Sequence, residues 1–201
     1  MLIEPTDILQ KCFSGLTWNN TNNRNEIYLT FDDGPAPSVT PWVLDTLNTY
    51  KAKATFFCLG KNVHLYPEIH LRILREGHRT GNHSYSHLKG WISSTDDYLE
   101  DVEKADRLIQ SPLFRPPYGK ITIAQIKQLR KNFRIIMWSL LTRDYDRKTA
   151  GDIIFQNIQK KLIPGTILVF HDSCQAEKNL RHVLPRTLEL IQSRNFVPAI
   201  L

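Results

Sequence analysis

The stretch Tyr28–Pro35, YLTFDDGP, places two adjacent carboxylates between an apolar run and a glycine-proline turn. The residues Ile27–Phe31 are β-branched, aromatic and apolar, which predicts a buried strand. Two adjacent anions repel each other, so Asp32 and Asp33 at the end of this strand need either a positive charge nearby or a structural reason to lie side by side. The rest of the chain can be searched for that charge.

Strand-like and helix-like segments alternate after this first strand, and seven strand–helix units in a row predict an α/β fold with a parallel sheet, open or closed into a barrel. Thr40 is expected to cap the first helix, and Ser94 to open a helix with acidic residues in its first turn. The further expected strands are 54–59, 78–82, a short one near 114, 134–138, 166–170 and 196–201. The further expected helices are 66–77, 121–131, 151–161 and 183–194.

Length and composition indicate one globular domain, since the chain has 201 residues, 41% hydrophobic and 23% charged. No linker or repeat divides it. Residues 1–25 are expected to form an N-terminal extension and residues 26–201 the catalytic domain. A monomer is favoured.

The net charge of +6 and the pI of about 9.3 are compatible with an anionic polymer as partner, but no nucleic-acid reading motif accompanies them, so no nucleic-acid partner is expected. No run of about 18 apolar residues predicts a membrane span. The N-terminus lacks the pattern of a signal peptide, which favours the cytoplasm, or the cell envelope if a leader is removed. The three cysteines form no C-x-x-C pair, and buried free thiols are expected.

Polar residues follow most of the predicted strands. Because the carboxyl ends of parallel strands meet at one edge, these side chains are expected to converge there. They are Asp32, Asp33, His83, His87, Arg115, Tyr118, Asp144 and His171.

The stretch His83–His87, HSYSH, spaces two imidazoles four residues apart. On a helical turn this spacing brings the two Cβ atoms to about 5–6 Å, which suits two adjacent positions on a metal ion. With Asp33 as third ligand the set becomes a two-histidine, one-carboxylate site. The cation would relieve the repulsion in the Asp32–Asp33 pair and leave Asp32 free to take a proton. Ser84 is expected to hold the loop through a hydrogen bond.

The motifs TFDDGP, HSYSH, FRPPYG and FHD together are similar to the ordered motifs of the polysaccharide deacetylases, the NodB-homology domains of carbohydrate esterase family four. The resemblance covers Glu26 to the C-terminus. It implies a distorted (β/α)7-type barrel with its active site at the C-terminal ends of the parallel strands. It also implies metal-dependent removal of acetyl groups from N-acetylated sugars, with one divalent ion, zinc foremost and cobalt, manganese or nickel as alternatives.

The resemblance also implies roles for single residues. Asp33, His83 and His87 match the metal ligands, and Asp32 matches the general base that takes a proton from metal-activated water. Arg115 matches the arginine that pairs with this base and holds it ionised.

Three more residues match catalytic positions of the family. The backbone N–H of Tyr118 is expected to stabilise the oxyanion. His171 matches the general acid that protonates the leaving amine, and Asp144 is expected to orient His171 and raise its pKa.

The substrate-binding positions depart from the family pattern. Leu141 stands where the family has an acid, Tyr145 where it has a tryptophan, and Val169 where a leucine often lines the acetyl pocket. Tyr145 can still offer a flat ring to a sugar, and Trp138 is a candidate wall of the pocket. Tyr118, Trp138, Tyr145 and Val169 are therefore the expected substrate-binding residues, with Trp91 and Tyr85 as further stacking candidates.

The expected function is N-deacetylation of an N-acetylglucosamine-containing glycan, such as peptidoglycan or a chitin oligosaccharide. One alternative is an O-acetyl esterase acting on acetylxylan. A second is a catalytically silent carbohydrate-binding domain, and a third is an iron oxygenase that uses the two-histidine, one-carboxylate set.

Overall fold

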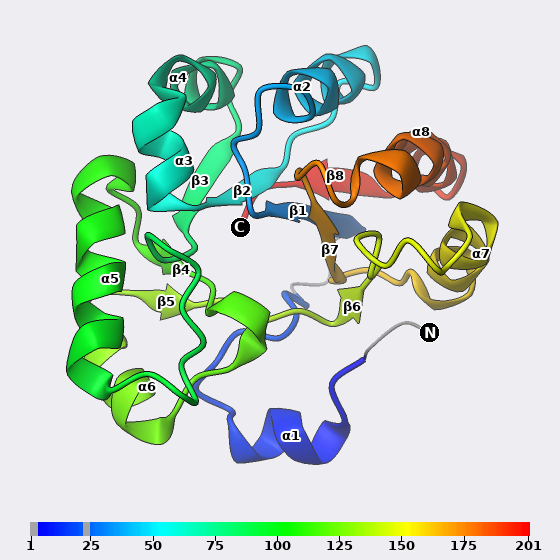
Figure 1. Ribbon diagram of the computed structural model, residues 1–201. Coiled ribbons are helices and arrows are strands. Elements are labelled where there is room, and N and C mark those ends of the chain that lie inside the picture. The colour runs from blue at the N-terminus through cyan, green and yellow to red at the C-terminus, as the bar shows by residue number, and fades with distance from the viewer. Residues whose placement is uncertain (1–3, 22–24) are drawn as a thin grey trace.

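Strand β1 (Glu26–Asp32) lies at the centre of a curled sheet with helices on its outside (Figure 1). The computed structural model describes residues 4–21 and 25–201. All strand pairs are parallel, in the order β5-β4-β3-β2-β1-β7-β6, and β8 pairs with the first half of β1. The other strands are β2 (Thr55–Cys58), β3 (Arg79–Asn82), β4 (Leu113–Phe114), β5 (Arg134–Ile135), β6 (Leu140–Leu141), β7 (Ile167–His171) and β8 (Val197–Ala199).

The expected distorted barrel is confirmed, in an open form. Among the described residues no strand pairing joins β5 to β6, the two ends of the sheet order, so the barrel does not close there. The helices are α1 (Asp7–Cys12), α2 (Thr40–Thr49), α3 (Gly60–Leu65), α4 (Pro67–Arg75), α5 (Thr95–Ile109), α6 (Ile123–Leu129), α7 (Gly151–Lys161) and α8 (Glu177–Ser193), with a 3₁₀ turn η1 (Pro117–Gly119).

The central strand forms because its side chains are apolar on both faces. Leu29 and Phe31 pack toward the helices with Phe56 and Phe170, whereas Tyr28 lies in a separate cluster. Such a strand, buried on both faces, is typical of parallel sheets. Its register pairs the Cα of Asp32 with Phe57 on β2 and with His171 on β7, which brings polar residues of neighbouring strands to the same edge.

Several expected elements agree with the structure. Helix α7 has the expected bounds, and the hydroxyl of Ser94 accepts from the backbone N–H of Asp97 at 3.1 Å, as expected of a helix N-cap. Helix α8 begins six residues before the expected start at Val183. It continues across Pro185 because Leu180, Leu184 and Leu188 form one buried face.

Three local expectations were wrong. Thr40 is the first helical residue and not the cap, because its hydroxyl donates to the buried carboxylate of Asp172 at 2.5 Å. Helix α3 and strand β6 were not expected, since they are six and two residues long and have no periodic pattern of their own. Of the cysteines only Cys58 is buried, while Cys12 and Cys174 are exposed, and all three are free.

The segment before β1 packs on the rest of the fold. Thr17 forms an isolated parallel bridge with Ile136, and Leu16 and Trp18 are buried in a cluster with side chains that include Phe133. The expected N-terminal extension also includes residues 1–3 and 22–24, which lie outside the described residues. No helix in the described part of the chain is both long and apolar enough to cross a membrane.

Candidate active site

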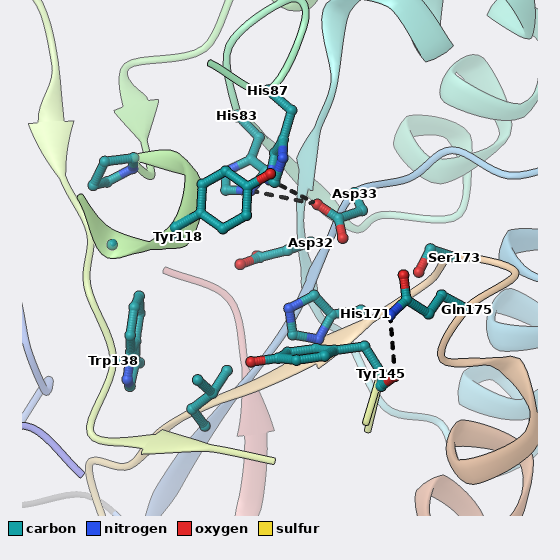
Figure 2. A pocket seen from close by; sticks show the side chains of 13 residues that line it. Asp32, Asp33, His83, His87, Tyr118, Trp138, Tyr145, His171, Ser173 and Gln175 are labelled. Atoms are coloured by element: carbon teal, nitrogen blue, oxygen red, sulfur yellow. Dashed lines mark hydrogen bonds and ion pairs between the residues drawn. The ribbon is translucent and has the colours of Figure 1, made fainter. Parts of the chain in front are cut away.

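A pocket of about 540 Å³ opens at the carboxyl ends of the strands, and the two adjacent aspartates lie in it. Figure 2 shows Asp33, His83 and His87 on one side of this pocket and His171 and Tyr145 on the other, with Asp32 between them. The expected convergence of polar residues at one edge of the sheet is therefore present in the structure.

The three expected metal ligands form one cluster. The ligand atoms of Asp33, His83 and His87 all lie within 4.8 Å of one another. Oδ1 of Asp33 is 3.2 Å from Nε2 of His87 and 3.6 Å from Nε2 of His83 (Figure 2). The two side chains follow the same strand, β3, while the carboxylate follows β1.

The protonation pattern of the cluster suits a cation. Nδ1 of His83 lies 2.8 Å from the carbonyl oxygen of Arg115 and must donate to it, so Nε2 presents a lone pair toward Asp33. Burial lowers the pKa of His83 to about 4, which leaves the ring neutral near pH 7. Although burial opposes ionisation, the nearby histidines keep the pKa of Asp33 well below its usual value.

A divalent ion fits this donor set. Oδ1 of Asp33 is buried and makes no well-aligned hydrogen bond, although two imidazole nitrogens face it. A buried, unpartnered carboxylate oxygen is costly unless a cation meets it. Asp33, His83 and His87 thus form a candidate site for one metal ion.

The loop that carries the histidines is fixed by hydrogen bonds. As expected, Oγ of Ser84 accepts from the backbone N–H of His87 at 3.0 Å. Ser84 and His87 both have left-handed backbones, with φ of 64° and 65°, which such bonds must sustain. Asp101 on α5 accepts from the backbone N–H groups of Tyr85 and Ser86, both at 3.0 Å.

Asp32 is held by a buried arginine. Nη1 of Arg115 donates to Oδ1 of Asp32 at 2.7 Å and to the hydroxyl of Thr30 at 2.8 Å. Nη2 of Arg115 donates to the carbonyl of Met137 at 2.9 Å, and its guanidinium stacks on Phe57. Burial lowers the pKa of Arg115, and the charge of Asp32 offsets part of this effect. The pairing of the two residues, expected from sequence, is present.

His171 and Asp144 form a second buried pair. Oδ1 of Asp144 lies 2.7 Å from Nδ1 of His171, and Oδ2 accepts from the backbone N–H of the same histidine at 2.9 Å. Burial lowers the pKa of His171, but the charge and hydrogen bond of Asp144 outweigh it and raise the pKa to about 9. Because Nδ1 donates to Asp144, Nε2 is the nitrogen available to the pocket.

Three of the expected substrate-binding residues line the pocket: Tyr118, Trp138 and Tyr145. The ring of Tyr118 lies 4.4 Å from the ring of His87, centroid to centroid, and that of Tyr145 meets His171 edge-on at 4.8 Å. Gly119, with φ of 65°, leaves room for Trp138, since a Cβ there would lie 2.4 Å from the indole.

Other candidates lie away from the pocket. Val169 has no exposed surface and is not among the residues that line the pocket, whereas Leu141 lines it. Trp91 and Tyr85 do not line it either. Trp91 is largely exposed, with its indole N–H bonded to the carbonyl of Ile121, and the ring of Tyr85 packs against the main core.

Asp172 and Asp101 support the site but were not predicted from the sequence to be part of it. Asp172 accepts from the backbone N–H of Gly34 at 3.1 Å and from Thr40, and so fixes the turn after Asp33. Burial raises the pKa of Asp172 to about 8, partly opposed by the hydrogen bond from Thr40. Asp101 lies on a helix rich in acidic residues, where the pattern indicates only a solvated face. The one sequence signal for Asp172 was its place in the motif FHD, directly after His171.

The arrangement combines three chemical capacities in one pocket. A cation site adjoins a carboxylate that is held by Arg115 and is not part of the ligand cluster, and a histidine with a raised pKa faces both. A candidate cation site, a carboxylate and a histidine with a raised pKa around one cavity are the groups that metal-assisted acid–base sites use.

The chain belongs to the polysaccharide deacetylase family, whose model, described as polysaccharide deacetylase, matches residues 19–133. A peptidoglycan-N-acetylglucosamine deacetylase of Bacillus cereus is 39% identical over 158 residues, which cover 75% of this chain and 57% of that protein. A chitooligosaccharide deacetylase of Azorhizobium caulinodans is 31% identical over 166 residues, covering 79% of each chain.

Among solved structures, the Bc1960 peptidoglycan N-acetylglucosamine deacetylase, in complex with a hydroxamate (4-naphthalen-1-yl-N-oxidanyl-benzamide), superposes with a TM-score of 0.87 at 32% identity. The superposition covers 93% of this chain and 91% of that one. Family and fold expected from the sequence motifs are thereby confirmed.

Proposed function

We propose that this chain is a metal-dependent hydrolase that removes N-acetyl groups from N-acetylglucosamine-containing glycans, either peptidoglycan or chitin oligosaccharides. The observation that carries the proposal is the cluster of Asp33, His83 and His87 next to Asp32, a carboxylate that Arg115 holds apart from it. The relatives named as peptidoglycan and chitooligosaccharide deacetylases support the same substrate class.

Asp33, His83 and His87 would hold the ion, for which zinc is the proposed identity, since two imidazoles and one carboxylate suit it. When bound, such a cation supplies Lewis acidity, which lowers the pKa of a coordinated water toward ~7 and polarises an acyl carbonyl.

Asp32 acts as the general base and accepts the proton of the water that attacks the acetyl carbonyl. The hydrogen bond from Arg115 fixes one carboxylate oxygen, which leaves the other to receive this proton. Because Asp32 is nearly buried, its orientation is set before substrate enters.

The backbone N–H of Tyr118 donates to the oxyanion that forms from the carbonyl oxygen. A donor of this kind is worth about 3 kcal/mol of barrier. The left-handed backbone at Tyr118, with φ of 59°, belongs to the turn η1 at the rim of the pocket and supports this role.

His171 acts as the general acid and gives its Nε2 proton to the leaving amine, so that acetate and a free amino sugar result. Asp144 acts through His171: it holds the ring in the tautomer and charge state that this step needs. The rings of Tyr145 and Trp138 and the side chain of Leu141 border the space left for the acetylated sugar.

The alternatives differ in what they require. An O-acetyl esterase uses the same residues, but its leaving alcohol needs less protonation than an amine, and the raised pKa of His171 favours the amide. A silent carbohydrate-binding domain does not need a general base, here Asp32 with Arg115. It does not need a general acid either, here His171 with Asp144. The reaction of an iron oxygenase would use neither the Asp32–Arg115 pair nor the His171–Asp144 pair.

We also propose that residues 26–201 form the catalytic domain, that residues 1–25 are an extension of it, and that the protein acts as a monomer. Every residue given a role above comes from this one chain and from the proposed catalytic domain.

Acetate release tests the proposal. Chito-oligosaccharides, peptidoglycan and acetylxylan are incubated with the protein in the presence of zinc, cobalt or a chelator, with Asp32→Asn as control. We expect acetate from an N-acetylated glycan that chelator abolishes, zinc restores and the variant does not produce. Acetate from acetylxylan alone, or equal release by the variant, would contradict the proposal.

A further inference from the structure

A second cavity, of about 400 Å³, adjoins the active-site pocket. It lies beside the loop that joins β7 to α8, and Gln175 lines both cavities. The side chain of Gln175 donates to the carbonyl of Tyr145 at 3.3 Å and lies across the pocket from Tyr118 and Trp138 (Figure 2). Gln175 is therefore the residue at which the two cavities meet.

The second cavity is lined by more positive than negative charge. Three cations line it, Arg147, Lys178 and Arg181, and one anion, Glu177. Glu177 is already engaged, since Nε and Nη2 of Arg181 donate to its Oε1 at 3.0 and 2.8 Å. The guanidinium of Arg181 also stacks on Trp42. Glu177 therefore neutralises the charge of Arg181, and Trp42 helps to fix its position.

Among the residues that the structure describes, the other two cations have no acidic partner. Nε and Nη2 of Arg147 make long contacts of 3.4 Å to the carbonyls of Gln175 and Cys174, and no carboxylate in residues 4–21 and 25–201 pairs with it. Lys178 makes no hydrogen bond or ion pair within the same ranges and is exposed. The nearest acid on the same loop, Asp146, is bound by Arg143, Thr149 and the backbone N–H of Lys148.

We infer that Arg147 and Lys178 form a subsite for a carboxylate on the sugar next to the one that is deacetylated. This inference rests on the proposed function, because the metal pocket must hold the acetylated sugar for the neighbour to reach the second cavity. A guanidinium with free N–H groups and a nearby ammonium bind a carboxylate through charge-assisted hydrogen bonds. The net charge of +6 adds long-range attraction for an acidic glycan.

The subsite gives the enzyme a preference between two substrate classes. Peptidoglycan carries a lactyl carboxylate, or a peptide attached to it, on every second sugar, whereas chitin oligosaccharides are neutral. The inferred substrate is therefore the acidic glycan, and the neutral oligomer is a substrate that lacks this contact.

The test uses three oligosaccharides of equal length, built from alternating N-acetylglucosamine and N-acetylmuramic acid: with free lactyl carboxylates, with these converted to methylamides, and with stem peptides. Binding is measured by calorimetry with the Asp32→Asn protein loaded with zinc, and acetate release with the active protein. The neutral chito-oligosaccharide serves as a fourth substrate.

The variant for this test is Arg147→Gln with Lys178→Gln. Its matched control is Arg75→Gln with Lys160→Gln, which removes the same charge from exposed positions on α4 and α7 that line neither cavity. We expect the double variant to raise Kd and KM for the free acid by about threefold to tenfold, while kcat and the values for the methylamide and the neutral oligomer stay unchanged. The control should leave Kd, KM and kcat unchanged, apart from an equal weakening of binding to all acidic oligosaccharides that disappears at high salt.

Equal affinity of the wild-type protein for free acid and methylamide would overturn the inference, as would an equal loss on all substrates in the double variant. Tighter binding of the peptide-bearing oligosaccharide than of the free acid, lost in the double variant, would assign the bound carboxylate to the peptide and overturn the assignment to the sugar. A protein that prefers the free acid in binding but releases no acetate from any oligosaccharide contradicts the proposed function and leaves the subsite standing.

Discussion

Arg115 and His83 are joined by a hydrogen bond of 2.8 Å from Nδ1 of the imidazole to the backbone carbonyl of the arginine. The side chain of the same arginine donates to Asp32 at 2.7 Å. One buried residue therefore orients a proposed metal ligand through its backbone and the proposed base through its guanidinium. The two halves of the site cannot shift independently.

Replacing Arg115 with methionine should abolish acetate release and destabilise the protein. The change leaves Asp32 without its cation in a buried position, and breaking such a pair costs about 3–5 kcal/mol of unfolding free energy. Urea unfolding measures this loss. The control Arg72→Met removes an arginine from two partly exposed ion pairs, with Asp45 and Glu76, and should cost about 1 kcal/mol or less. An Arg115 variant as stable as the control would contradict the proposed pairing.

Replacing Asp144 with asparagine should change the pH profile of kcat. Asp144 outweighs the effect of burial and raises the pKa of His171 to about 9, and His171 must be protonated to act as an acid. Without that charge the basic limb of the profile should move to lower pH by about 1–2 units. The pH dependence of acetate release measures this shift, and an unmoved basic limb would exclude His171 as the titrating acid.

The same pair should also make the stability of the metal-free protein depend on pH. The pKa of His171 is higher in the folded protein than the usual value near 6.5. The stabilisation is therefore complete below about pH 6.5 and is lost as the pH rises through about 9. The difference in unfolding free energy between wild type and Asp144→Asn should shrink across this range.

Replacing Ser84 with alanine should weaken metal binding. The hydroxyl of Ser84 accepts from the backbone N–H of His87, and supporting bonds of this kind are worth about tenfold or more in metal affinity. Ser93→Ala is the matched control, since within the described part of the chain its hydroxyl bonds only to the carbonyl of Lys89. Competition with a fluorescent zinc chelator gives both affinities. If the two variants bind zinc equally well, Ser84 has no positioning role.

The residues that touch the pocket could be predicted because they follow strands. Asp32 and His171 end neighbouring strands whose register pairs them, so the alternation of elements alone places them at one edge. Helix bounds were predictable where a cap or a charge pattern marks them, as at Ser94. Short elements such as α3 and β6 have no such mark, because packing against the sheet determines them.

The supporting residues were harder to find in the sequence. Asp101 reaches the histidine loop from the side of a helix whose other acids face solvent, and nothing in its spacing separates it from them. Val169 was expected to line the acetyl pocket, yet Leu141 and not Val169 lines the cavity that the structure shows. Which of two neighbouring apolar side chains borders a cavity depends on strand twist and loop path, which the sequence pattern does not specify.

Metal content of matched variants tests the central claim most directly. Wild-type protein, Asp33→Ala and Asp32→Asn are dialysed against zinc and analysed for bound metal per chain. If Asp33 binds the metal and Asp32 acts only as the base, the wild type should bind one ion per chain. Asp32→Asn should also bind one ion but release no acetate, and Asp33→Ala should bind none. Zinc retained by Asp33→Ala, or lost from Asp32→Asn, would contradict it.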